Sequence, residues 1–106
     1  MKHVTIDVPK GKTNLSSITG SYEILTRANS YWEKLGNKPK MEISIAGFVP
    51  ELKLDSGFFS IHPISLQEIK VTDLLIIPSV NYDENLIEDN AELIKWIKDN
   101  IKPAPK

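Results

Sequence analysis

The chain has 106 residues and a formal net charge of -1, and it contains no cysteine. This length predicts one small domain, and the balanced charge without a basic patch argues against direct binding of nucleic acid. The absence of cysteine excludes disulfides, thiolate metal sites and thiol nucleophiles within the chain. No apolar run reaches the ~18 residues of a membrane span, so we expect a cytoplasmic protein with no membrane partner.

The amino-terminal part of the sequence predicts two strands joined by a long helix. The apolar stretch His3–Val8 predicts the first strand, and Met41–Ala46 predicts the second. The helix is expected to begin near Asn14 or Ser16, which are both good N-cap residues, and to end at Gly36. Its predicted apolar stripe comprises Leu15, Ile18, Tyr22, Leu25, Trp32 and Leu35.

The middle of the sequence predicts a hairpin followed by a buried strand. Leu52–Leu54 and Phe58–Ile61 flank the residues Asp55-Ser56-Gly57, whose composition is typical of a hairpin turn. Thr72–Ile77 is rich in consecutive apolar residues, which is typical of a strand buried on both faces.

The last helix is predicted within residues 83–101, either in one piece or divided by a second N-cap at Asp89 or Asn90. Helices placed between strands imply parallel strands joined by right-handed crossovers. We therefore predict an α/β fold of three layers, with a mainly parallel sheet, flanking helices and the hairpin inserted at the periphery. The first strand is central in this prediction. We expect residues 1–102 to form the domain and residues 103–106 to form a tail.

Several short sequences in a fixed order carry a family resemblance. They are a first strand closed by Pro9, the segment Asn14–Asn29 with its Gly20-x-Tyr22-Glu23, the run Thr72–Pro78, and Glu92–Ile97. Together they resemble the amino-terminal half of a DJ-1/PfpI-like domain of the class I glutamine amidotransferase-like superfamily. The resemblance spans residues 2–101 and is strongest to the domains found in AraC-type transcriptional regulators. It implies an incomplete flavodoxin-like, or DJ-1-like, fold.

The chain departs from the enzymes of that family where their chemistry resides. Those enzymes carry a cysteine nucleophile on the turn after the next strand, and many have Pro-Gly-Gly where this chain has Pro78-Ser79-Val80. We therefore predict no enzymatic activity, no catalytic residue and no cofactor. The resemblance implies a non-catalytic sensor or dimerisation part of an AraC-type regulator, which binds a small-molecule effector. DNA would be bound through a separate carboxy-terminal domain.

Two other interpretations stay open. The chain could be a fragment of a PfpI-like hydrolase or amidotransferase that lacks its nucleophile half, or a small structural subunit completed by another chain.

Three residues are weak candidates for ligand binding. Glu23 stands where some relatives point a carboxylate at the reactive cysteine, and the alternative is a solvated helix residue. Ser79 follows the last predicted strand, at the sheet edge where ligands bind in open α/β folds, and the alternative is an ordinary turn serine. Asn81 lies two residues further on.

Other polar residues have structural interpretations. His3 and His62 are isolated, so no metal site is expected. Asp7 lies inside the predicted central strand, and we expect it near the wet carboxyl end of that strand because a buried carboxylate needs a partner.

The outer edge of Thr72–Ile77 predicts self-association. An open edge with apolar side chains recruits another strand unless a charge blocks it, and only Asp73 stands in that position. Trp96 and Ile97 on the last helix are expected to be partly uncovered. We therefore predict a two-fold homodimer that uses this edge, the last helix, or both.

Overall fold

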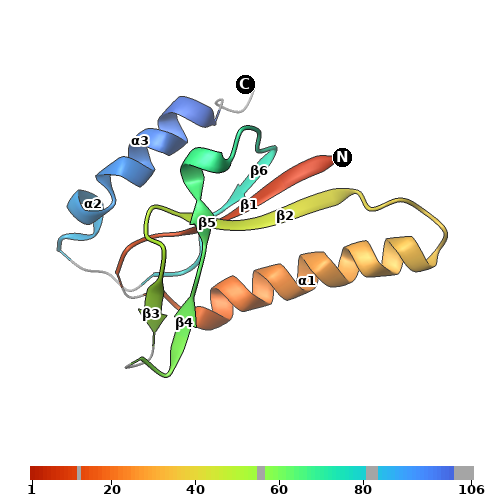
Figure 1. The fold of residues 1–106 in the computed structure, drawn as a ribbon, viewed down its shortest axis with the longest axis horizontal. Coiled ribbons are helices and arrows are strands. Elements are labelled where there is room, and N and C mark those ends of the chain that lie inside the picture. Colours follow the sequence, from red (N-terminus) through yellow and green to blue (C-terminus); the bar gives the residue numbers. More distant parts are fainter. Residues whose placement is uncertain (12, 55–56, 81–83, 102–106) are drawn as a thin grey trace.

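A computed structural model describes residues 1–11, 13–54, 57–80 and 84–101 (Figure 1). The elements are β1 (Lys2–Val8), α1 (Leu15–Lys34), β2 (Met41–Gly47), β3 (Leu52–Leu54), β4 (Phe59–Ile61), β5 (Ile64–Ser65), the 3₁₀ helix η2 (Leu66–Glu68), β6 (Leu74–Ile76), α2 (Leu86–Asp89) and α3 (Ala91–Asn100). The sequence does not predict β5 and η2, because segments of two and three residues are too short to show a periodic pattern.

A four-stranded parallel sheet forms the centre of the fold, in the order β5-β2-β1-β6. The predicted α/β fold class and the central position of β1 are confirmed. β1 pairs with β2 from Lys2 to Val8 but with β6 only from Val4 to Ile6. β3 and β4 form a separate antiparallel hairpin at the periphery, as predicted, although residues 55–56 of its turn lie outside the described residues.

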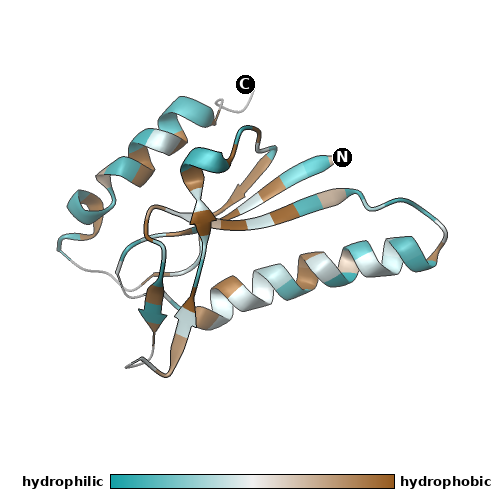
Figure 2. Ribbon diagram, viewed as in Figure 1, coloured by the Kyte–Doolittle hydropathy of each residue, from teal (hydrophilic) through white to brown (hydrophobic). Residues whose placement is uncertain are grey.

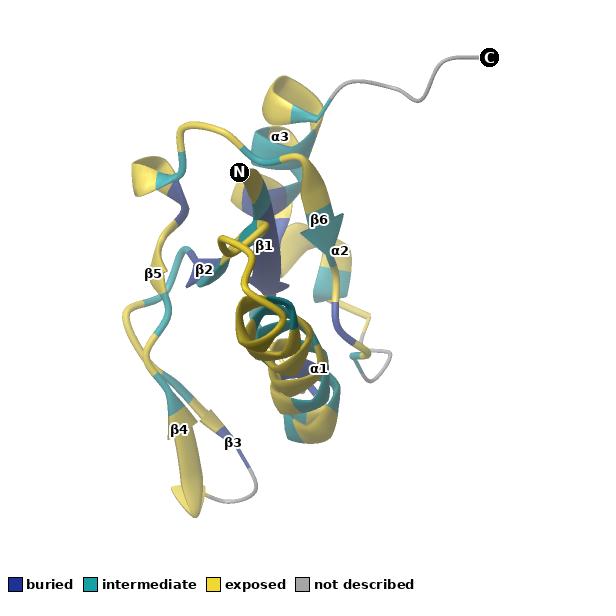
Figure 3. Cartoon of the chain, turned by 90° about the vertical axis from the view of Figure 1, so that its right-hand side faces the viewer, coloured by how far each residue is buried: buried dark blue, intermediate teal, exposed yellow. Residues whose placement is uncertain are grey.

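Helices cover the two faces of the sheet (Figures 1 and 3). Ile6 and Val8 of β1 pack against Ile18 of α1 on one face, whereas Ala46 of β2 packs against Leu93 of α3 on the other. Successive side chains of a strand point to opposite faces of the sheet, which explains why the two sets of residues pack on different faces. Bands of higher and lower hydropathy alternate along β1 and β2 in agreement with this (Figure 2). Burying each such Ile or Leu side chain contributes roughly 1.5–3 kcal/mol before entropy is counted.

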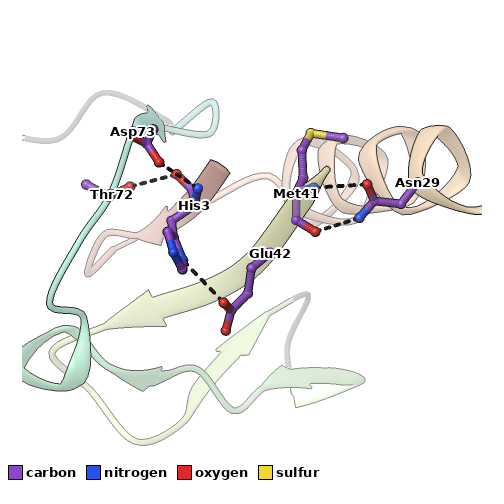
Figure 4. A network of polar contacts seen from close by, with 6 residues as sticks. All are labelled: His3, Asn29, Met41, Glu42, Thr72 and Asp73. Atoms are coloured by element: carbon purple, nitrogen blue, oxygen red, sulfur yellow. Dashed lines mark hydrogen bonds and ion pairs between the residues drawn. The ribbon is translucent and has the colours of Figure 1, made fainter. Parts of the chain in front are cut away.

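At the amino end of the sheet, polar contacts join the residues before β6 to β1 and join α1 to β2 (Figure 4). The Asp73 amide donates to the His3 carbonyl at 2.7 Å, and the Asp73 carboxylate accepts from the His3 amide at 2.8 Å. The bond from the His3 amide keeps the pKa of Asp73 below its usual value. On α1, the Asn29 side chain donates to the Met41 carbonyl at 2.7 Å and accepts from the Met41 amide at 3.2 Å.

The prediction that Thr72–Ile77 is buried on both faces is wrong. The strand is shorter, Leu74–Ile76, and it lies at the edge of the sheet. Leu74 and Ile77 are 51% and 56% exposed, since no described strand lies beyond β6 to cover them.

The apolar stripe predicted for α1 is only partly correct. Ile18 is buried and Leu15, Leu25 and Trp32 are half-buried, but Tyr22 and Leu35 are exposed. Gly36 has a φ of 91°, which confirms the left-handed conformation expected at the end of the helix.

The last helix is divided at Asn90, one of the two points that the sequence suggests. Asn90 occupies the N-cap position of α3, but its side chain makes no cap bond. Instead its carbonyl oxygen accepts from the Lys10 amide at 2.7 Å, and its amide nitrogen donates to the carbonyls of Lys10 at 3.0 Å and Leu86 at 2.8 Å. This buried side chain therefore holds the loop after β1 against α2 and α3.

We expect Asn90→Ala to lower the free energy of unfolding by about 1–3 kcal/mol, because the buried Lys10 backbone groups lose their partners. Urea denaturation followed by circular dichroism measures the change. Asn100→Ala is the matched control, since it removes an exposed bond to the Trp96 carbonyl and should cost less than about 0.5 kcal/mol. Equal losses for the two variants would contradict this role of Asn90.

Candidate functional site

Polar side chains gather where the loops after β1 and β6 meet, at the carboxyl edge of the sheet. The Asn14 side chain donates to the Ser79 hydroxyl at 2.9 Å, and the Ser79 amide donates to the Ser17 hydroxyl at 2.9 Å. The Asn14 amide also donates to the Ser79 carbonyl at 2.9 Å. We call Asn14, Ser17 and Ser79 the carboxyl-edge cluster. It lies at the amino end of α1, where ligands commonly bind in open α/β folds.

The geometry of the carboxyl-edge cluster suits hydrogen bonding and not covalent chemistry. Ser79 and Asn14 are exposed, so a polar molecule can reach their side chains. A serine nucleophile needs a general base within hydrogen-bond reach. Among the described residues, the Ser79 hydroxyl is bonded to the Asn14 amide, which is not a base.

The other two predicted ligand residues are not shown to join this cluster. Glu23 lies on α1 six residues after Ser17, about 9 Å further along the axis, and its side chain is exposed. No hydrogen bond or ion pair joins it to Ser79 within the described part of the chain. Asn81 lies outside the described residues.

Asp7 is the most unusual side chain on the sheet, and the expectation that it lies in a wet environment is wrong. It is 0% exposed, and no described group donates a hydrogen bond to either carboxylate oxygen. Asp7 stands opposite Ala46 in the register, so it faces the α3 side of the sheet. The reason is that β1 is covered over its whole carboxyl-terminal half, from Val4 to Pro9.

Burial raises the pKa of Asp7 to about 7. The backbone N–H of Val8 offsets only part of this rise, since it lies nearby but does not reach hydrogen-bond geometry with the carboxylate. The carboxyl group is therefore largely protonated below neutral pH. The buried side chain of Asn90 is not a partner of Asp7, since its described bonds go to Lys10 and Leu86.

The buried carboxyl makes stability depend on pH with a definite sign. The pKa of Asp7 is higher in the folded chain than its ordinary 3.8, so the folded state binds the proton more tightly. The free energy of unfolding should fall as pH rises from about 4 to about 7 and stay low above that, with a loss of up to about 4 kcal/mol. Asp7→Asn should remove most of this dependence, so that the variant is the more stable protein at about pH 8.

Urea denaturation at about pH 5 and about pH 8 checks the prediction. Asp99→Asn on the exposed end of α3 is the control and should leave the wild-type pH dependence intact. A wild-type chain and an Asp7→Asn variant with parallel pH profiles would show that Asp7 does not titrate as described.

No group of three or more His, Asp or Glu side chains that could hold a metal ion occurs among the described residues. His3 contacts Glu42 at 3.2 Å and His62 contacts Glu51 at 3.8 Å, as two separate pairs. Within the described ranges, no helix is both long and apolar enough to cross a membrane.

Two solved structures share this fold. One is a protein from Vibrio parahaemolyticus that is inferred to be a transcriptional regulator, with a TM-score of 0.72 and 27% identity over 92% of this chain and 49% of that one. The other is an AraC family transcriptional regulator from Pseudomonas putida, with a TM-score of 0.56 and 17% identity over 88% of this chain and 60% of that one. No protein-family model and no curated protein matches the sequence.

These similarities support the link to transcriptional regulators that the sequence suggests. The chain spans about half the length of the Vibrio protein and three-fifths of the Pseudomonas protein. At 17% identity, the second match shows a common fold only. Neither neighbour is described as a DJ-1/PfpI-like protein, so that part of the resemblance stays a prediction.

Proposed function

We propose that this chain is the non-catalytic sensor and dimerisation part of an AraC-type transcriptional regulator, built on a DJ-1/PfpI-like domain. The observation that carries the proposal is the similarity to the Vibrio protein over 92% of this chain. DNA binding belongs, in this proposal, to a carboxy-terminal domain outside residues 1–106.

The carboxyl-edge cluster is the proposed place for a small polar effector. Ser79 and Asn14 offer exposed hydrogen-bonding groups there, and Ser17 fixes the Ser79 backbone. The cluster joins the loop after β6 to the first turn of α1. An effector bound to it would therefore act on the orientation of a helix and a strand end together.

The alternative function, a fragment of a PfpI-like hydrolase or amidotransferase, has less support. The sequence has no cysteine, and the Ser79 hydroxyl is bonded to an amide and not to a base. We expect the purified chain to show no hydrolase, amidotransferase or glyoxalase turnover, because covalent catalysis needs an activated nucleophile. Assays with a chromogenic peptide, glutamine and methylglyoxal test this. Turnover that copurifies with the chain and disappears in Ser79→Ala would establish the enzyme instead.

The same proposal makes a prediction about DNA. Residues 1–106 should bind DNA weakly and without sequence preference, because a chain of net charge -1 has little capacity to displace counterions from phosphates. Fluorescence anisotropy with the regulator's own upstream DNA and a scrambled duplex, at two salt concentrations, measures this. Sequence-selective binding at submicromolar protein would place the DNA-binding function inside this chain and overturn the division of roles.

A further inference from the structure

α1 carries a second apolar surface that the sheet does not use. Ile24, Tyr31 and the C-cap residue Leu35, directly after α1, are 70%, 72% and 70% exposed, and Ala28 is also exposed. The spacing of these four residues is four, three and four, which places them along one side of the helix. We call Ile24, Ala28, Tyr31 and Leu35 the α1 flank. Soluble monomers rarely align large apolar side chains in the open in this way.

The α1 flank faces the open side of the molecule. Ser17 lies seven residues before Ile24, on the same side of the helix, and its hydroxyl bonds to the loop after β6. Asn29, roughly 140° away from Ile24 around the axis, bonds to β2 instead. The flank therefore points to the side of the free β6 edge, where Leu74 is also exposed.

The opposite side of α1 is covered. Leu52 of β3 and Ile61 of β4 pack against the cluster formed by Ile6, Val8 and Ile18, so the hairpin closes the β2 side. Figure 3 shows the hairpin on one side of α1 and no described element beneath the helix.

We propose that the α1 flank is a contact of a two-fold homodimer, in which α1 packs antiparallel against α1 of a second copy; this rests on the dimerisation role proposed above. With Ala28 on the two-fold axis, its small side chain lets the helices approach closely. Ile24 then fits between the partner subunit's Tyr31 and the partner subunit's Leu35.

The charges beside the flank complement one another in this arrangement. Glu23, Arg27 and Lys34 are exposed on its outer side, and none of them forms an ion pair within the described part of the chain. In the antiparallel register with Ala28 on the axis, Glu23 stands opposite a position one residue away from the partner subunit's Lys34. The two-fold symmetry produces this pair twice. A parallel two-fold pair would instead put the charged sides of the two helices on opposite sides of the contact, so Glu23 would not meet the partner subunit's Lys34.

The flank is small for an interface. Four side chains on one helix provide less than the ~800 Å² per partner of a standard stable interface, so the predicted dissociation constant is micromolar. The exposed end of β6 lies on the same side of the molecule and can add to the contact. Such a dimer would need no change in the fold of either copy.

Charge reversal tests the proposal by sedimentation velocity across a concentration series that reaches about 200 µM. Glu23→Lys and Lys34→Glu should each raise the dimer dissociation constant at least about tenfold, because each creates two repulsive contacts. The double variant should return it to within about threefold of wild type. Glu92→Lys on exposed α3 is the charge control and should change nothing. Circular dichroism confirms that each variant folds.

Cross-linking provides a second measurement, which is clean because the chain has no cysteine of its own. Ala28→Cys should form a disulfide-linked dimer under mild oxidation, since the two thiols meet at the axis, whereas Lys98→Cys on α3 should not. A wild-type chain that is monomeric over the whole concentration series would overturn the proposal. A dimer that survives both single charge reversals would overturn it as well. If Ile77→Lys beside β6 abolishes the dimer and the charge reversals do not, the α1 flank is not the contact. That result would keep the dimerisation role proposed above and move its contact to the β6 edge.

Discussion

The pairing of β1 with a strand on each side is the constraint on which the rest of the structure depends. A central parallel strand has no solvent face, so every side chain from Val4 to Val8 is buried whatever its chemistry. This is why α1 and α3 must cover opposite faces, and why Thr5 and Asp7 are buried together with the apolar residues. Burial is costly for Asp7, because no described residue donates a hydrogen bond to its carboxylate.

Asn90 illustrates how the layers are held once β1 is fixed. The loop after a central strand carries backbone groups that the sheet cannot pair. Asn90 supplies both a donor and an acceptor to Lys10, so a single side chain satisfies that loop and joins it to α2 and α3. The main structural role of Asn90 is therefore to connect the loop after β1 to the two helices, and not to cap α3. A conventional N-cap would satisfy only the helix.

The sequence predicts those features that depend on local pattern. β1, α1, β2 and the hairpin follow from spacing and turn composition, and the strand order follows from the alternation of strands and helices. Burial is harder to predict, because it depends on neighbours that are distant in sequence. An apolar run such as Leu74–Ile77 looks the same in the sequence whether its side chains are covered or exposed, so the run alone does not show how far an edge strand is buried. The same limit explains Asp7, whose sequence context does not reveal that both faces of β1 are covered.

The sequence suggests where a ligand site would lie, but it does not suggest which side chains meet there. Topology indicates the end of β6, and Ser79 is there, yet its partners Asn14 and Ser17 look in the sequence like the start of a helix and nothing more. Glu23 stays a prediction as a ligand residue. The family resemblance suggests that role, and its exposed position on α1 also fits the proposed contact between copies.

The space beside α1 is covered on the β2 side of the sheet and, among the described elements, uncovered on the β6 side. This difference explains why the exposed apolar residues of the α1 flank and β6 lie on one side of the molecule. On the β2 side, the hairpin covers the space beside α1 with Leu52 and Ile61. On the β6 side, Leu74 and the α1 flank are left uncovered by any described element. Scattered exposed apolar residues need no explanation, but residues that fall along one side of a helix, on the same side of the molecule as an unpaired strand, are more than scattered. The proposed effector site at Ser79 is joined to α1 through Ser17, so in this proposal a change in the loop after β6 reaches the proposed dimer contact without crossing the core.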